Sequence, residues 1–355
     1  ARAMQAMRDG DWAAARIAAR ADGPESVDVI LWHYLRAGRG DAAQVQDFLT
    51  RNPDWPGLPY LREQSEAAMT AAPHDQVLAF FAGQDPQTGA GALTLARAHA
   101  ARGDVGSAEA TVVMAWRTLP LSGDERRAFL QDWGDLLAPH HVARLDMALW
   151  RGWSSNAAAI VPLVSEDWQA LAEARIALRE QRAGVDARIE AVPETLADHP
   201  GLAFERFLWR MRKGRFSDAA DLLIDRTGSI DTLGEPSAWA DEREDLARDV
   251  LRDGDYARAY RIASAHGLEE GRDFEALEWL SGFIALRFLD RADLAVMHFR
   301  RFSEGVTSPI SVGRAGYWLG RALEAQKQPE AAAEAYARGA RYQTSFYGLL
   351  AAERG

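Results

Sequence analysis

The chain has 355 residues, of which 48% are hydrophobic, and a formal net charge of −11. This length can bury a large or long continuous core, and the acidic balance makes nucleic acid and anionic membranes unfavourable partners. Cysteine is absent, which excludes disulfides, thiolate chemistry and cysteine-based zinc sites, and no run of about 18 apolar residues suggests a membrane span.

One pattern recurs along the chain: a polar turn, often with glycine, is followed by an alanine-rich amphipathic stretch. A glycine in the turn can take the left-handed conformation that ends a helix, and the Asp or Ser that follows can cap the next helix. The segments are "RDGDWAAARIAARADG" (8–23), "ARGDVGSAEATVVMAW" (101–116), "RKGRFSDAADLLIDRTG" (212–228), "RDGDYARAYRIASAHG" (252–267), "LDRADLAVMHFRRFSEG" (289–305) and "AQKQPEAAAEAYARGA" (325–340).

This repeat predicts a helix-turn-helix hairpin. One hairpin cannot bury its apolar face alone, so neighbouring hairpins should stack, and no sustained period-2 run predicts a strand. We therefore expect an all-α fold over 1–355, a superhelical solenoid of TPR-like repeats. The expected turn glycines are Gly10, Gly103, Gly214 and Gly254, and the alanines expected at close helix contacts are Ala14, Ala108, Ala219 and Ala259.

Proline-containing segments mark the loops between the expected helices. They include "RNPDWPGLP" (51–59) and "TLPLSGDE" (118–125), where Ser122 followed by two acids predicts a helix start. The passage "RTGSIDTLGEPSAW" (226–239) is the most loop-like and indicates a possible subdivision of the array.

No motif predicts catalysis, a metal or a cofactor. "GAGALT" (89–94) lacks the third glycine or the Lys-Ser/Thr of a phosphate loop, which favours a simple helix entry. None of the eight histidines falls in an HExxH pattern. Glu25-Ser26 is the only Glu-Ser pair, and its context predicts an acid in the first turn of a helix.

The twelve tryptophans raise the possibility of carbohydrate binding, because sugar rings stack on aromatic side chains. Most occur among Ala, Leu and Phe on predicted helices, where core packing is the better interpretation. Trp55 and Trp153 lie in loop-like contexts and are the more plausible exposed ones.

Several segments resemble, in order, the large α-superhelical domain of the soluble lytic transglycosylases of Gram-negative cell walls. The similarity covers nearly the whole chain, and the ordered pieces "SPIS", "RAGYWLGRA" and "TSFYGLLAAE" are its most specific part. The segments are "NPDWPGLPYLREQSE" (52–66), "FFAGQDPQTGAGALTLARAHAARGD" (80–104), "ARLDMALWRGWSSNAAAIVPLVSEDWQALAEARIAL" (143–178), "EALEWLSGFIALRFLDRADLAVMHFRRFSEGVTSPISVGRAGYWLGRALEA" (275–325) and the final "ARYQTSFYGLLAAE" (340–353).

The resemblance implies a ring- or horseshoe-shaped scaffold that encloses peptidoglycan strands in the periplasm, with the signal peptide removed. It also implies non-hydrolytic cleavage to 1,6-anhydro-MurNAc products by a C-terminal lysozyme-like domain with a Glu-Ser catalyst. Glu25-Ser26 lacks the context of that motif, so no catalytic residue is expected in this chain. Implied partners are the glycan strands, the catalytic domain and other cell-wall enzymes.

The segment 341–355 resembles the seam between the superhelix and the domain that should follow it. Ser345 or Thr344 is expected to cap a short helix there, with Phe346 sharing a face with Leu349 or Leu350. Candidate contacts with that domain or with glycan, with core packing as the competing interpretation, are Tyr317, Trp318, Arg321, Tyr342, Phe346 and Tyr347.

Two other functions fit the sequence. A non-catalytic helical-repeat adaptor that binds a protein partner agrees equally well with the repeats alone. An all-α cytosolic enzyme fits less well, because no acid–base, metal or phosphate constellation is evident.

Overall fold

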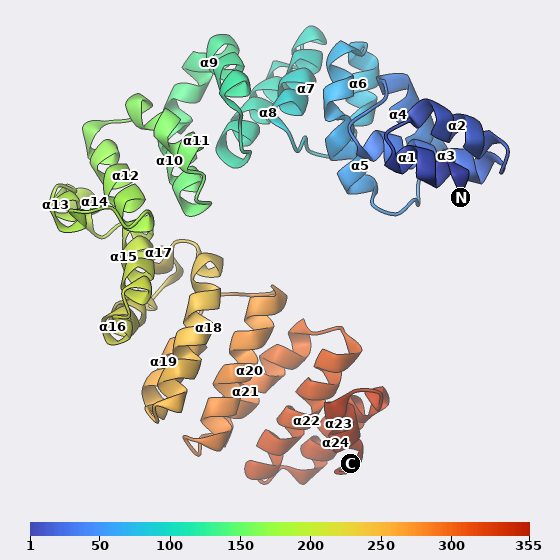
Figure 1. Ribbon diagram of the computed structural model, residues 1–355. Helices are drawn as coiled ribbons and strands as arrows, with labels where there is room; N and C mark the ends of the chain where they lie inside the picture. Colours follow the sequence, from blue (N-terminus) through green and yellow to red (C-terminus); the bar gives the residue numbers. More distant parts are fainter. The chain divides into compact units, whose positions relative to one another are not determined.

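A computed structural model describes residues 1–355, which are helical throughout and contain no β-strand (Figure 1). The all-α prediction is therefore confirmed. The chain divides into two compact units, residues 1–168 and 169–355. No helix combines the length and the hydropathy that a membrane span requires.

The helices are mostly short, and 3-10 turns link several of them. Those that begin in the first unit are α1 (Arg2–Arg8), α2 (Trp12–Arg20), α3 (Pro24–Arg36), α4 (Ala42–Arg51), α5 (Leu58–Ser65), η1 (Glu66–Ala71), α6 (His74–Phe80), α7 (Gly89–Ala101), α8 (Val105–Thr118), α9 (Gly123–Leu137), η2 (Ala138–His140), α10 (His141–Trp150), α11 (Ser154–Ile160), η3 (Val161–Leu163) and α12 (Glu166–Arg179). The second unit continues with α13 (Val185–Glu190), α14 (Glu194–Ala197), α15 (Pro200–Arg212), α16 (Phe216–Arg226), α17 (Ile230–Leu233), α18 (Pro236–Arg252), α19 (Tyr256–Ser264), α20 (Gly271–Arg287), α21 (Ala292–Gly305), α22 (Pro309–Ala325), α23 (Pro329–Gly339), η4 (Ala340–Tyr342) and α24 (Phe346–Ala352).

In both units a helix packs mainly against its neighbours in the sequence. α7 packs against α8, α18 against α19, and α20 against α21. Helices two apart also touch, as α1 does with α3, α7 with α9, and α20 with α22. In the second unit these successive helices lie side by side (Figure 1).

The turn between paired helices has the predicted chemistry. Gly103 between α7 and α8 has a φ of +79°, and the Asp104 side chain accepts a hydrogen bond from the Ser107 N–H at 3.2 Å. Aspartate caps α2 and α19 in the same way. Where the turn has no glycine, Asp290 and Lys327 take the left-handed conformation instead, with φ of 53° and 61°. The hairpin geometry therefore imposes this conformation even on residues that adopt it with some strain.

The predicted small residues at the helix contacts are correct in three of four repeats. Ala108, Ala219 and Ala259 are fully buried. In the first repeat the prediction of Ala14 is wrong, because Ala15 is fully buried and Ala14 only half-buried. Like the other buried alanines, Ala15 stands five positions after its turn glycine, so the first repeat keeps the common register.

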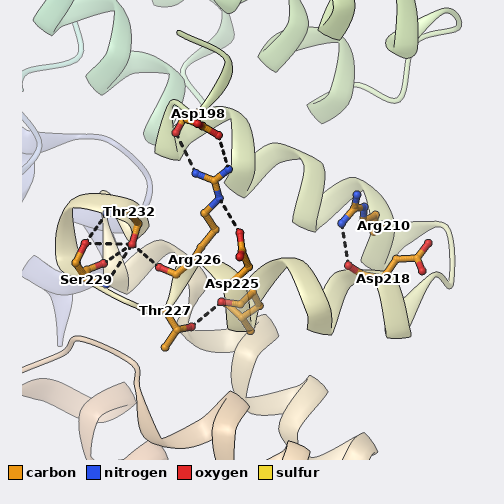
Figure 2. Close-up of polar contacts among 9 residues, drawn as sticks. Asp198, Arg210, Asp218, Asp225, Arg226, Thr227, Ser229 and Thr232 are labelled. Carbon is orange, nitrogen blue, oxygen red and sulfur yellow. Dashed lines mark hydrogen bonds and ion pairs between the residues drawn. The ribbon is translucent and has the colours of Figure 1, made fainter. Parts of the chain in front are cut away.

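The passage 226–239 is more ordered than the sequence indicated. Ser229 and Thr232 form a capping box at the start of α17, and the Thr232 hydroxyl donates to the Arg226 carbonyl at 2.6 Å. The Arg226 guanidinium in turn donates to Asp198 Oδ1 at 2.9 Å (Figure 2). The loop prediction is wrong here because Gly and Pro separate two helices, α17 and α18. A subdivision of the array at this passage stays a prediction.

At "GAGALT", where α7 begins, two carboxylates of the chain accept hydrogen bonds from the free N–H groups of the helix start. Glu66 accepts hydrogen bonds from two backbone N–H groups and from the Thr88 hydroxyl. Glu125 accepts one from a backbone N–H in the first turn of α7, at 2.8 Å. Acids are favoured at a helix start, where N–H groups lack partners. Gly91 is required because a Cβ there would overlap the buried Glu66 side chain.

Buried arginines donate hydrogen bonds to the free carbonyl groups at the carboxyl ends of helices. Arg144 is fully buried and donates to the Leu119 carbonyl, just after α8, at 3.3 Å. Arg243 is also fully buried and donates to the carbonyls of Ile262 and Ala265, at the end of α19, at 2.8 and 3.0 Å. Burial lowers the pKa of each arginine to about 10, so both stay charged at neutral pH.

Replacing Gly91 with Ala should lower the free energy of unfolding by about 2 kcal/mol, because the added methyl group displaces the buried Glu66 carboxylate from its donors. The matched control is Gly106→Ala in the adjacent helix α8, where a Cβ meets nothing within 4 Å. That change should be neutral or slightly stabilising. Urea unfolding followed by circular dichroism measures both, and equal stability of the two variants would contradict the role of Gly91.

Candidate functional site

The predicted contact residues lie in the second unit, on α22, η4 and α24. α22 and α24 approach closely where two glycines meet. A Cβ at Gly313 would lie 2.6 Å from Ser345 Oγ and 3.1 Å from the Gly348 backbone nitrogen. Ser345 caps α24 by accepting the Gly348 N–H at 3.1 Å, as the sequence predicted for this position or its neighbour.

The structure gathers five of the six predicted residues into one cluster. The Tyr347 ring centroid lies 5.6 Å from that of Tyr317, 6.2 Å from that of Trp318 and 5.2 Å from that of Phe346. Arg321 donates to the Tyr317 hydroxyl at 3.0 Å. We call these five residues the aromatic cluster.

Tyr342, the sixth, acts through its backbone. Its carbonyl accepts hydrogen bonds from the N–H and hydroxyl of Ser345, at 3.0 and 2.9 Å. The same carbonyl lies where a Cβ on Gly348 would have to stand. Tyr342 thus fixes the start of α24, which presents Tyr347 to the cluster.

Burial separates the packing residues from the accessible ones. Tyr317 and Trp318 are 8% and 9% exposed, so the interpretation as core or inter-helix packing holds for these two. Phe346 is 69% exposed, and Leu349, one turn further along α24, is 51% exposed. The accessible part of the cluster is therefore the apolar face of α24.

Arg314 extends the cluster and was missed by sequence reasoning. Its guanidinium carbon lies 3.7 Å from the ring centroid of Trp279 on α20 and 6.0 Å from that of Tyr347. Burial lowers the pKa of Arg314. The pairing has no sequence signal, because Arg314 and Trp279 belong to different helices. The stacked guanidinium therefore contributes to the packing between α20 and α22.

A second polar group, also missed, is buried between α20 and α21. Glu278 is fully buried; its Oε1 pairs with His266 Nε2 at 3.0 Å and its Oε2 with His298 Nδ1 at 2.6 Å. Arg301 forms an ion pair with Oε1 at 2.6 Å. The Leu268 N–H donates to His266 Nδ1, which leaves the ring proton on Nε2 to donate to Glu278.

The hydroxyl of Tyr260 completes this group by pairing with His298 Nε2 at 2.9 Å. A hydroxyl, an imidazole and a carboxylate in series can activate a nucleophile. Here Glu278 and both histidines have partners within the chain and are at most 2% exposed. The network therefore joins α19 and the loop after it to α20 and α21. Burial alone would raise the pKa of Glu278, but the histidine hydrogen bonds outweigh it and lower that pKa to about 2.

Every tryptophan of the chain is buried or half-buried. Trp116, Trp150, Trp279 and Trp318 are buried as predicted. Trp55 and Trp153, predicted to be the exposed ones, are only half-buried, as are several of the others. The Trp55 ring packs edge-on against Phe48 of α4, which covers part of its indole.

The chain matches no known protein family and no curated protein. Glu25 lies in the first turn of α3, as its sequence context predicted.

Replacing Glu278 with Gln should lower the free energy of unfolding by about 2 kcal/mol at neutral pH, because the buried donors lose their charged acceptor. The folded pKa of about 2 lies below the ordinary value of 4.5. The carboxylate therefore stabilises the fold fully above pH 4.5, and this contribution is lost as the pH falls towards about 2. The difference between wild type and variant should shrink over that range.

Urea unfolding at a series of pH values measures this difference. Glu269→Gln, at an exposed position shortly before α20, is the control and should follow the wild type. A difference between wild type and Glu278→Gln that stays constant down to the lowest pH would contradict the assignment.

Proposed function

We propose that this chain is the superhelical scaffold region of a peptidoglycan lytic transglycosylase. In this role it encloses and orients MurNAc–GlcNAc strands in the periplasm. A lysozyme-like domain of the same protein then cleaves them without water to 1,6-anhydro-MurNAc products. The observation that carries the proposal is the order of family-like segments, from "NPDWPGLPYLREQSE" (52–66) to "TSFYGLLAAE" (344–353).

The architecture proposed for this role is a TPR-like solenoid, ring- or horseshoe-shaped in the family. Its support is the repeated hairpin with a left-handed turn residue and a buried alanine five positions after the turn glycine. Packing of each helix on its sequence neighbours agrees with such an array. A concave surface of this kind can follow an extended polymer.

The apolar face of α24 is the proposed contact with the catalytic domain. Phe346 and Leu349 on α24 are large, apolar and more than half exposed, and so is Ile310 at the start of α22. Exposed apolar groups of this size gain stability when a partner covers them. The resemblance places the catalytic domain after this helix.

The purified chain should bind isolated sacculi without releasing anhydro-muropeptides, because none of its carboxylates is proposed to act as the catalyst. Chromatography with mass spectrometry of the soluble products measures release, and sedimentation with sacculi measures binding. An active lytic transglycosylase, added to a parallel sample, is the positive control. Clear turnover by the chain alone would sink the claim that it carries no active site.

A helical-repeat adaptor for a protein partner is the second candidate, since the exposed side chains on α24 would serve it equally. The gene beyond the codon for Gly355 separates the two. A reading frame that continues into a domain with a Glu-Ser motif favours the transglycosylase, and a stop codon close by favours the adaptor.

A further inference from the structure

A cleft of about 600 Å³ opens in the first unit, between α3 and the loop after α4. One wall is formed by Val29 and Trp32, which lie three positions apart on the same face of α3. The other wall is formed by residues 51–56, which include Trp55. Each wall thus contributes one indole, and we call this site the two-tryptophan cleft.

Contacts within the chain hold the walls of the cleft in place. The indole N–H of Trp32 donates to the Pro56 carbonyl at 3.0 Å and so ties the two walls together. The backbone N–H of Trp55 donates to the Asn52 carbonyl at 3.3 Å, and the Trp55 ring packs edge-on against the buried Phe48. Proline at two positions of the loop fixes its backbone further. A preformed site loses little entropy on binding.

The polar groups left free in the cleft are hydrogen-bond acceptors. Asn52 uses its Nδ2 to donate to the Phe48 carbonyl at 3.2 Å, which leaves its Oδ1 for a ligand. Asp54 is exposed, and no hydrogen bond from the chain reaches its carboxylate. Arg51, the one cation in the lining, is held by Asp28 and Asp47 at 2.6 and 2.9 Å. The ligand must therefore supply the donors.

The charged side chains at and near the cleft disfavour both anionic and cationic ligands. An anion would meet Asp54 and the two aspartates that already neutralise Arg51. A cation would compete with Arg36, whose guanidinium carbon lies 4.4 Å from the Trp32 ring centroid and 5.0 Å from that of Tyr60. The remaining class is a neutral molecule with an apolar face and hydroxyl donors. A proline-rich peptide fits less well, because such grooves offer an indole N–H and that of Trp32 is occupied.

We propose that the two-tryptophan cleft binds a neutral saccharide ring. The ring's C–H face stacks on Trp55, since the Arg36 guanidinium already lies against the Trp32 ring. The hydroxyls of the saccharide donate to Asp54 and to Asn52 Oδ1. The inference rests on the proposed function, because a glycan strand would supply such a ring. It adds a glycan subsite within the first unit, at the loop that carries Trp55.

Titration of the purified 355-residue chain with N,N′,N″-triacetylchitotriose, followed by tryptophan fluorescence and calorimetry, tests the proposal. We expect saturable binding with a dissociation constant in the millimolar range. Asp54→Ala should weaken it about tenfold, because a charged acceptor is lost. Trp55→Ala should abolish it. Asp54 is exposed, so its variant should melt at the wild-type temperature and stay interpretable even if Trp55→Ala is destabilised.

The matched controls are Asp135→Ala, at an exposed site in α9, and Trp153→Ala, at the other loop tryptophan. Both should bind like the wild type. The proposal is overturned if the trisaccharide does not bind saturably, if Asp54→Ala binds equally well, or if a polyproline peptide displaces the trisaccharide.

Failure here is distinguishable from failure of the proposed function. If the chain binds sacculi but not the trisaccharide, the cleft inference fails and the scaffold role stands. If the trisaccharide binds through Asp54 but the chain does not bind sacculi, the cleft inference stands and the scaffold role fails.

Discussion

The unpaired main-chain groups at helix ends impose the constraint on which this structure depends. Each α-helix leaves N–H groups free at its start and carbonyl groups free at its end, and this chain has twenty-four α-helices, most of them short. At several of these ends, charged side chains supply the missing hydrogen-bond partners. Glu66 and Glu125 accept from N–H groups at the start of α7, and Arg144 and Arg243 donate to carbonyl groups at the ends of α8 and α19. Charge that would be costly alone becomes stabilising when it faces a helix end.

The same constraint bears on where the two proposed contact surfaces lie. Where a helix ends in a proline-containing loop, as α4 does before Pro53, the chain stays near the surface and leaves an open cleft. Where a serine side chain satisfies a helix start, as Ser345 does for α24, the helix can remain at the surface with Phe346 exposed. Both candidate contact surfaces of the molecule are therefore at helix ends, and the closely packed helix middles form the core.

Local signals in the sequence predicted the local structure. The turn at Gly103, the cap at Ser122 and the cap at Ser345 depend on residues within four positions of one another, so the pattern alone reveals them. The passage 226–239 was misjudged because glycine and proline also punctuate closely spaced helices.

The contacts between helices were beyond sequence reasoning. Glu278 meets His266 and His298 from positions 12 and 20 residues away, and Arg314 meets Trp279 across two helices. Such pairs have no fixed spacing, because the packing of whole helices decides them. The burial of arginines such as Arg144 could likewise not be predicted, since an arginine in a helix usually indicates a solvated face.

The proposed function is that this chain orients glycan strands for a catalytic domain. The most direct measurement compares the product of the whole gene with its catalytic domain alone, on intact sacculi and on short soluble glycan chains. The account predicts similar rates on the soluble chains and clearly greater release from sacculi when residues 1–355 are present. Equal release from sacculi by the two proteins, or a gene without such a domain, would contradict it.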